Sequence, residues 1–192
     1  MHKSLLKEIV LEQEKDRQDI DAGIPRAALS VALRHASLPH AVVVSGVRRC
    51  GKSTLLNQII SDLYKKGVYY FNFEDERLVD FNVEDFNHLY EVFLELYGNN
   101  KVFFFDEVQN VPQWEVFVRR MQGKGCKFFI TGSNASLLSK ELGTKLTGRN
   151  VSIELFPFSF MEFLSFKGFQ LSKNSLSLTS ERAAIKKHFA EY

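Results

Sequence analysis

The sequence predicts a three-layer α/β fold in which helices cover both faces of a parallel sheet. Two stretches carry this prediction. A glycine-bearing stretch, residues 46–54, stands between the apolar run 41–44 and the helix-like segment 55–60. A second apolar run, residues 102–105, ends in two acidic residues, and continuous apolar runs are typical of strands buried on both faces. The 192 residues suffice for one full core with a small appendage.

The composition is that of an ordinary soluble globular protein, with 45% hydrophobic and 25% charged residues. A formal net charge of +2 neither supports nor excludes nucleic acid as a partner. The N-terminal residues show no apolar signal core, and no apolar run approaches the roughly 20 residues that span a bilayer. We therefore expect a cytoplasmic protein without membrane association. Cys50 and Cys126 fall at opposite ends of predicted strands, so no disulfide is expected between them.

Residues 46–54 fit the pattern G-x-x-x-x-G-K-[ST] between a strand and a helix, which is the context of a phosphate-binding loop. Backbone N–H groups at a helix N-terminus offer a polyphosphate the hydrogen bonds that it loses from water. Lys52 is expected to reach the β- and γ-phosphates, and the Ser53 hydroxyl to ligate Mg²⁺. The predicted nucleotide-binding residues are Gly46, Val47, Arg48, Arg49, Cys50, Gly51, Lys52, Ser53 and Thr54.

The elements before and after this loop follow from periodicity. Residues 1–22 are expected to form a helical arm or surface helix, because apolar residues recur there at helical spacing among charges. A second helix is expected to start at Pro25, since proline is favoured in a first helical turn. A helix from residue 52 to about 67 then leads to an aromatic and β-branched strand, residues 68–73.

Two acidic residues, Asp106 and Glu107, directly follow the apolar strand 102–105. Ligands of open α/β sheets lie outside the carboxyl ends of the strands, so both acids are expected to face the phosphate loop. Asp106 is then predicted to serve Mg²⁺, directly or through a water. Glu107 is predicted to polarise a water for attack on the γ-phosphate.

Further helices are expected over residues 86–97, with Asp85 as cap, and over residues 112–121. A buried strand, residues 126–130, follows and ends in small polar residues. Of these, Ser133 and Asn134 are predicted to bond the attacking water or the γ-phosphate. The alternative is that they only cap the next predicted helix, residues 135–142.

Arg149 precedes a predicted strand, residues 151–155. Its guanidinium could neutralise charge on the transferring phosphoryl group, in its own subunit or a neighbouring one, or it could form a surface salt bridge. An aromatic-rich helix is expected over residues 159–166. Residues 167–192 are expected to be a polar linker, then a helix capped by Ser180 that starts a truncated C-terminal helical region.

The chain resembles the AAA+ superfamily, and more narrowly the bacterial and archaeal ATP-binding proteins that carry a C-terminal domain of unknown function. The residues that carry the resemblance are GVRRCGKST (46–54), FDEVQNVPQW (105–114), ITGSN (130–134) and LTGRNVSIELFPFSFMEF (146–163). The resemblance implies an ATPase domain over residues 23–166 and a parallel five-stranded sheet in the order 5-1-4-3-2. It further implies a Walker A motif at the phosphate loop, a Walker B motif at Asp106, a catalytic Glu107, a polar sensor at Ser133 or Asn134, and an arginine-finger candidate at Arg149.

The function expected from these residues is Mg²⁺-dependent ATP binding and hydrolysis that switches a partner domain or subunit. The partner is expected to be a second copy of the chain or a missing C-terminal domain. One alternative is an ATP-gated interaction module with negligible turnover. Another is a P-loop kinase or GTPase, which is disfavoured because an Asn-Lys-x-Asp guanine-reading motif is absent and because an acid directly follows Asp106.

Overall fold

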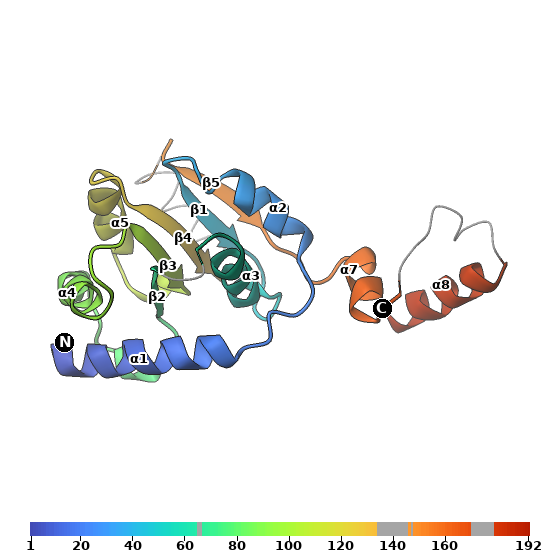
Figure 1. Ribbon diagram of the computed structural model, residues 1–192, viewed down its shortest axis with the longest axis horizontal. Coiled ribbons are helices and arrows are strands. Elements are labelled where there is room, and N and C mark those ends of the chain that lie inside the picture. The colour runs from blue at the N-terminus through green and yellow to red at the C-terminus, as the bar shows by residue number, and fades with distance from the viewer. Residues whose placement is uncertain (65–66, 134–145, 147, 170–178) are drawn as a thin grey trace.

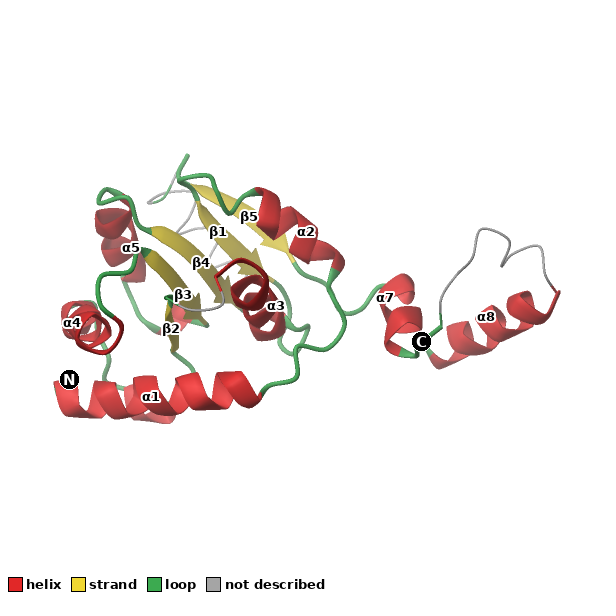
Figure 2. Ribbon diagram, viewed as in Figure 1, coloured by secondary structure: helices red, strands yellow, loops and turns green. Residues whose placement is uncertain are grey.

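The computed structural model describes residues 1–64, 67–133, 146, 148–169 and 179–192. Within them, a parallel five-stranded sheet lies between two layers of helices (Figures 1 and 2). The strands are ordered β2-β3-β4-β1-β5, which confirms the predicted α/β class and the order 5-1-4-3-2. Their bounds are β1 Ala41–Ser45, β2 Tyr69–Asn72, β3 Val102–Asp106, β4 Lys127–Gly132 and β5 Asn150–Glu154.

The larger core cluster lies on the face of the sheet that α1, α4 and α5 cover. These helices span Lys3–Asp19, Asp85–Tyr97 and Trp114–Gln122, respectively. Phe103 and Phe105 of β3 contribute their rings to this cluster, and Phe103 stacks on Phe128 of β4 with ring centroids 4.7 Å apart. The predicted apolar stripe of α1 is buried here, because Leu6 and Ile9 pack into the same cluster.

The opposite face is covered by α2, Ala27–Arg34, and α3, Lys52–Ile59. Phe104 of β3 points to this side and stacks on Phe129 of β4 with centroids 4.6 Å apart. Successive phenylalanines of β3 therefore point to opposite faces and fill both cores, as expected for a strand that is covered on both faces.

Several predicted boundaries differ in detail. Pro25 precedes α2 rather than starting it, because Arg26 is the N-cap residue and the helix begins at Ala27. The predicted helix after the phosphate loop ends as an α-helix at Ile59 and continues as a π-helical turn, Ile60–Tyr64. Asp85 is the first residue of α4, and its carboxylate accepts from the preceding Asn82 N–H, 3.0 Å, instead of capping the helix.

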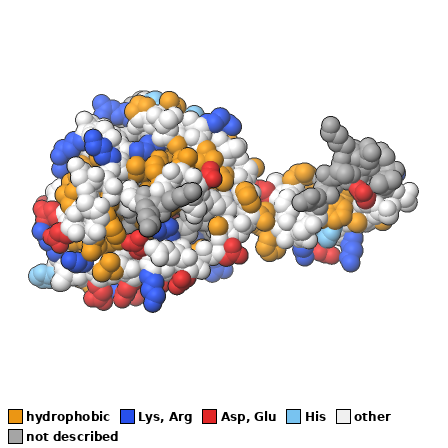
Figure 3. Space-filling model, in the orientation of Figure 1, with side chains coloured by type: hydrophobic (Ala, Val, Ile, Leu, Met, Phe, Trp, Pro, Cys, Tyr) orange, Lys and Arg blue, Asp and Glu red, His pale blue; other side chains and the backbone are white. Residues whose placement is uncertain are grey.

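Two helices follow the sheet, α7 Phe160–Phe166 and α8 Thr179–Glu191, and both lie beyond the edge strand β5 in Figure 1. Ser180 lies inside α8 rather than at its cap. Hydrophobic side chains gather around α7 (Figure 3), where Phe156, Met161 and Phe166 are exposed. None of the helices in the described ranges combines the length and apolar character of a transmembrane span.

A capping box starts α7. The Ser159 hydroxyl accepts from the Glu162 N–H, and the Glu162 carboxylate accepts from the Ser159 N–H, 2.8 Å. Burial acts to raise the pKa of Glu162, but hydrogen bonds from the Ser159 and Ala27 N–H groups and from Arg26 lower it to about 2. The ionised carboxylate therefore stabilises the fold.

Glu162→Gln should lower the free energy of unfolding by about 1–2 kcal/mol near neutral pH, an amount reduced for partial solvent screening. Because the folded carboxyl has the lower pKa, its contribution is complete above the unfolded pKa of about 4.5 and fades as the pH falls toward 2. Urea unfolding from pH 7 to pH 3 should thus show the two proteins converging as the pH falls. Glu95→Gln, at a half-exposed carboxylate 3.8 Å from Lys7, is the control and should change little; a Glu162→Gln deficit that stays constant down to pH 3 would contradict the assignment.

Candidate functional site

The phosphate loop joins the end of β1 to the start of α3. A Cβ atom on Gly46 would lie 2.1 Å from the Leu155 carbonyl oxygen, so only glycine fits where the loop passes the end of β5. Gly51 caps α3 with a φ of 95°, which is in the left-handed region that favours glycine. Both glycines of the motif are therefore required by the backbone path, and α3 directs its N-terminus to the carboxyl edge of the sheet.

Lys52, the first residue of α3, is buried beside the loop. Its Nζ lies 3.3 Å from the carbonyl oxygens of Gly46 and Val47, and 3.1 Å from Glu107 Oε1. A buried ammonium is costly unless it is paired, and Glu107 supplies the opposite charge. The structure thus joins the end of the phosphate loop to the acidic end of β3.

Three donors surround the carboxylate of Glu107. Gln109 Nε2 and the Ser133 N–H approach Oε2 at 2.6 and 3.0 Å, and Lys52 approaches Oε1. Burial acts to raise the pKa of Glu107, but these three donors hold it below its ordinary value. The carboxylate is therefore ionised and fixed in place, which suits it to orient a water molecule more than to accept a proton.

Asp106 is fully buried at the end of β3. The Thr131 hydroxyl donates to its Oδ1, and the Tyr70 hydroxyl donates to Oδ2 at 3.3 Å. Burial raises the pKa of Asp106, while hydrogen bonds from Ser53, Thr131 and Tyr70 oppose the rise. A carboxylate hydrogen-bonded to a serine hydroxyl is a pair of hard oxygen ligands, and such ligands fit Mg²⁺.

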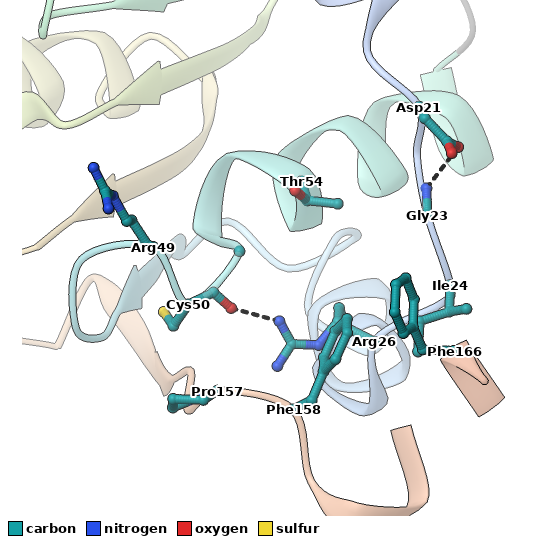
Figure 4. Close-up of a pocket in the computed structure, with 11 residues that line it drawn as sticks. Asp21, Gly23, Ile24, Arg26, Arg49, Cys50, Thr54, Pro157, Phe158 and Phe166 are labelled. Carbon is teal, nitrogen blue, oxygen red and sulfur yellow. Dashed lines mark hydrogen bonds between the residues drawn. The ribbon is translucent and has the colours of Figure 1, made fainter. Parts of the chain in front are cut away.

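Two hollows flank the phosphate loop. One, of about 390 Å³, is lined by the loop and by acidic residues that follow β2 and β3. Its lining residues are Arg48, Arg49, Gly51, Lys52, Ser53, Thr54, Glu74 and Glu107. The other, of about 310 Å³, is largely apolar (Figure 4) and shares Arg49, Gly51 and Thr54 with the first. Ile24 and Phe158 also line it. A charged hollow thus adjoins an apolar one across the same loop.

The structure separates the predicted catalytic residues into three groups. Ser133 lies beside Glu107, as its N–H bond to that carboxylate shows. Asn134 and the predicted helix 135–142 lie outside the described residues. Arg149 lies at the amino ends of the strands, opposite the phosphate loop, because its carbonyl accepts from the Ala41 N–H at the start of β1. The five residues of β1 span about 16 Å, so the structure does not bring Arg149 to its own phosphate loop.

Sequence reasoning missed several residues that hold the site. Thr131 donates to Asp106 and accepts from the Glu107 N–H at 3.0 Å. Gln109 braces Glu107, and Arg26 donates to the Cys50 carbonyl, 2.6 Å, from outside the motif. Position offered a signal for Thr131, which ends a predicted strand in the small polar run 131–134. No sequence signal indicated a role for Arg26, which lies 24 residues before Cys50.

Comparison with known proteins assigns the family. The sequence profile of a family described as "AAA domain" matches residues 39–164. The chain belongs to this AAA-domain family. The phosphate loop, both acids of β3 and Arg149 all lie within the matched segment, which is consistent with a nucleotide-binding ATPase-like domain.

Two curated relatives are similar over much of this AAA-domain chain. It is 44% identical over 150 residues to the uncharacterized protein MJ1544 of Methanocaldococcus jannaschii, covering 78% of this chain and 33% of that protein. It is 36% identical over 157 residues to an uncharacterized protein of Haemophilus influenzae, covering 78% of this chain and 37% of that protein. The matched segment thus spans about a third of each relative.

Solved structures with a similar fold include a crystal structure of a DNA replication initiation factor, with a TM-score of 0.48 and 16% identity. That alignment covers 85% of this AAA-domain chain and 58% of the other. AMPPCP-bound DnaA from Aquifex aeolicus gives a TM-score of 0.48 at 16% identity, over 78% of this chain and 53% of the other.

Thr131→Val should destabilise the protein by about 1–3 kcal/mol, because Asp106 and the Glu107 N–H would each lose a buried hydrogen bond at nearly constant volume. Urea unfolding followed by circular dichroism measures this. Ser165→Ala is a matched control, since that hydroxyl bonds the Met161 carbonyl at an exposed helix position, and it should be nearly neutral. Equal stabilities for Thr131→Val and wild type would remove Thr131 from this role.

Proposed function

We propose that this chain binds ATP with Mg²⁺ and hydrolyses it, and that the cycle switches a partner domain or subunit. The observation that carries the proposal is the 3.1 Å pair between Lys52 and Glu107. It places the lysine of the phosphate loop beside the acid that follows Asp106, at the edge where parallel sheets bind ligands.

The phosphates would occupy the charged hollow. Backbone N–H groups of residues 46–54 and the N-terminus of α3 would cradle them, with Lys52 on the β- and γ-phosphates. The adjoining apolar hollow, which Ile24 and Phe158 help to line, suits the base. This placement uses both hollows for one nucleotide.

Ser53 and Asp106 would hold Mg²⁺. When bound, the ion would neutralise charge on the phosphate oxygens. Asp106 already meets Thr131 and Tyr70 through both oxygens, so the Ser53 hydroxyl is the more available ligand, with Asp106 acting beside it.

Hydrolysis needs a water oxygen to form a bond to the γ-phosphorus while the bond to the bridging oxygen breaks, giving ADP and phosphate. A polyphosphate that draws Lys52 away from Glu107 would leave the carboxylate free to orient that water. Ser133 and Gln109 would keep the carboxylate in position, and the water's proton would pass to Glu107 or to a phosphate oxygen.

Arg149 would contribute only across a subunit interface, because it lies at the far edge of its own sheet. In that role its guanidinium would approach the nucleotide of a neighbouring copy. Turnover would then rise with protein concentration.

A nucleotide-gated module with negligible turnover is the second candidate. It is favoured by the three donors around Glu107, which lower its basicity. The curated relatives are also much longer than the matched segment, so a partner domain could be required for turnover.

Lys52→Ala should weaken ATP binding at least 100-fold, because the mutation removes the one ammonium of the phosphate loop. Isothermal titration with Mg²⁺-ATP measures the affinity. Lys7→Ala is the control and should leave the affinity unchanged. It removes a half-exposed ammonium of α1 that lies 3.8 Å from Glu95 of α4. Binding by Lys52→Ala within threefold of wild type would contradict the assignment of the loop.

Glu107→Gln should retain ATP binding and lose turnover about 100-fold or more, since the neutral amide cannot orient the water as the carboxylate does. Phosphate release is measured over a range of protein concentrations, beside Arg149→Ala. Loss of the concentration dependence in Arg149→Ala would support action across subunits. Turnover by Glu107→Gln at the wild-type rate would exclude Glu107 from catalysis, and tight binding without turnover in wild type would favour the gated module.

A further inference from the structure

Arg26 is a buried arginine outside every recognised motif. It lies just before α2 and is 5% exposed. Its backbone N–H donates to Gln58 Oε1, 3.1 Å, on α3. The backbone of Arg26 is thus held beside the helix that begins at the phosphate loop.

The guanidinium of Arg26 connects three separate segments. Nη1 donates to the carbonyl of Cys50 in the phosphate loop, 2.6 Å, and Nη2 donates to the carbonyl of Phe156 after β5, 2.7 Å. Nε donates to Glu162 Oε1 of α7, 2.9 Å. Its plane lies over the Phe158 ring, 4.9 Å from the centroid, and Figure 4 shows it between that ring and Cys50. Each of the three guanidinium nitrogens thus donates a hydrogen bond.

Glu162 is the counter-ion of Arg26 and has further partners of its own. Oε1 also accepts from the Ala27 N–H at the start of α2, 2.9 Å, and Oε2 accepts from the Ser159 N–H and hydroxyl. One carboxylate therefore fixes the starts of α2 and α7 and the side chain of Arg26.

The contact with the phosphate loop is close. A Cβ atom on Gly51 would lie 2.8 Å from Arg26 Nη1, so the guanidinium packs directly against the N-cap of α3. A buried ion pair contributes little net stability compared with apolar residues of the same volume, but it fixes geometry. The bonds of Arg26 fix the loop relative to the segment after β5.

We propose that Arg26 is a positioning residue that couples nucleotide binding at the phosphate loop to residues 156–166, with Glu162 as its counter-ion. The inference rests on the proposed function, because it requires a nucleotide at the loop. Arg26 and Phe158 both line the apolar hollow beside the loop. A nucleotide that fills this hollow would contact both sides of the connection, and its binding would stabilise α7.

The test combines ATP affinity with hydrogen–deuterium exchange of residues 160–166, with and without Mg²⁺-ATP, for wild type, Arg26→Gln, Arg26→Lys and Glu162→Gln. Each protein is compared at a nucleotide concentration that saturates it. Wild type should gain protection in α7 on binding ATP. Arg26→Gln should bind ATP about tenfold more weakly and lose that protection, and Arg26→Lys, which keeps the charge but cannot reach three partners, should restore it partly.

Arg77→Gln is the matched control. Arg77 pairs with Asp75 and Glu12 at 2.8 and 2.7 Å, away from the phosphate loop. Its replacement should leave both ATP affinity and α7 protection at the wild-type level. If the loss of any paired arginine lowered stability enough to change ATP affinity and α7 protection, Arg77→Gln would change them as well. A change confined to Arg26→Gln would instead support coupling through Arg26.

The outcomes separate the two claims. A wild-type protein that does not bind ATP would overturn the proposed function and this inference together. If wild type binds ATP and Arg26→Gln keeps its affinity and α7 protection, the coupling is wrong and the proposed function stands. If Arg26→Gln fails to fold, Glu162→Gln decides. An undiminished gain of α7 protection on binding ATP would overturn the coupling, and loss of that gain would support it.

Discussion

Charges at the carboxyl edge of the sheet are removed from water, and this constraint governs the site. Lys52 and Asp106 are almost fully buried, and Glu107 is only 8% exposed. Because an unpaired buried charge costs several kcal/mol, each must find partners in its neighbours. Thr131 and Ser133 supply them from the end of β4 and the residue after it, and Gln109 supplies one from the turn after β3. The phosphate loop and the acidic end of β3 are consequently held together by the ion pair of Lys52 with Glu107.

The aromatic core makes this arrangement stiff. Consecutive phenylalanines of β3 stack on β4 on opposite faces of the sheet, Phe103 on Phe128 and Phe104 on Phe129. Close-packed interiors resist small shifts, so the end of β3 cannot slide relative to β4. Asp106 and Thr131 therefore keep their register, which the proposed orientation of a water by Glu107 would require.

The sequence supported the prediction of what is local and periodic. Apolar runs located the strands, and the loop motif with its strand and helix located Lys52 and Ser53. The strand order followed from family resemblance, since local patterns do not say which strands are neighbours. Position along the chain could not place Arg149 relative to the loop, because a residue before a strand lies at the amino edge of a parallel sheet while the phosphates are expected at the other. The ends of helices also depended on tertiary partners, as Asp85 shows: its carboxylate pairs with the N-terminal ammonium of Met1 and accepts from the nearby Asn82 N–H instead of capping α4.

Arg26 escaped prediction for a different reason. Its partners lie 24, 130 and 136 residues away, and no periodicity links such positions. The segment that it reaches also meets the loop by a second route, because the Leu155 N–H donates to the Ser45 carbonyl, 2.7 Å, and the Leu155 carbonyl lies against Gly46. Two independent contacts thus tie the phosphate loop to residues 155–162. A rearrangement of the loop must either break them or move that segment, and breaking buried, charge-assisted bonds is the costlier course. The chain after β5 is therefore the part of the described structure best placed to respond to the loop, and it leads directly into α7.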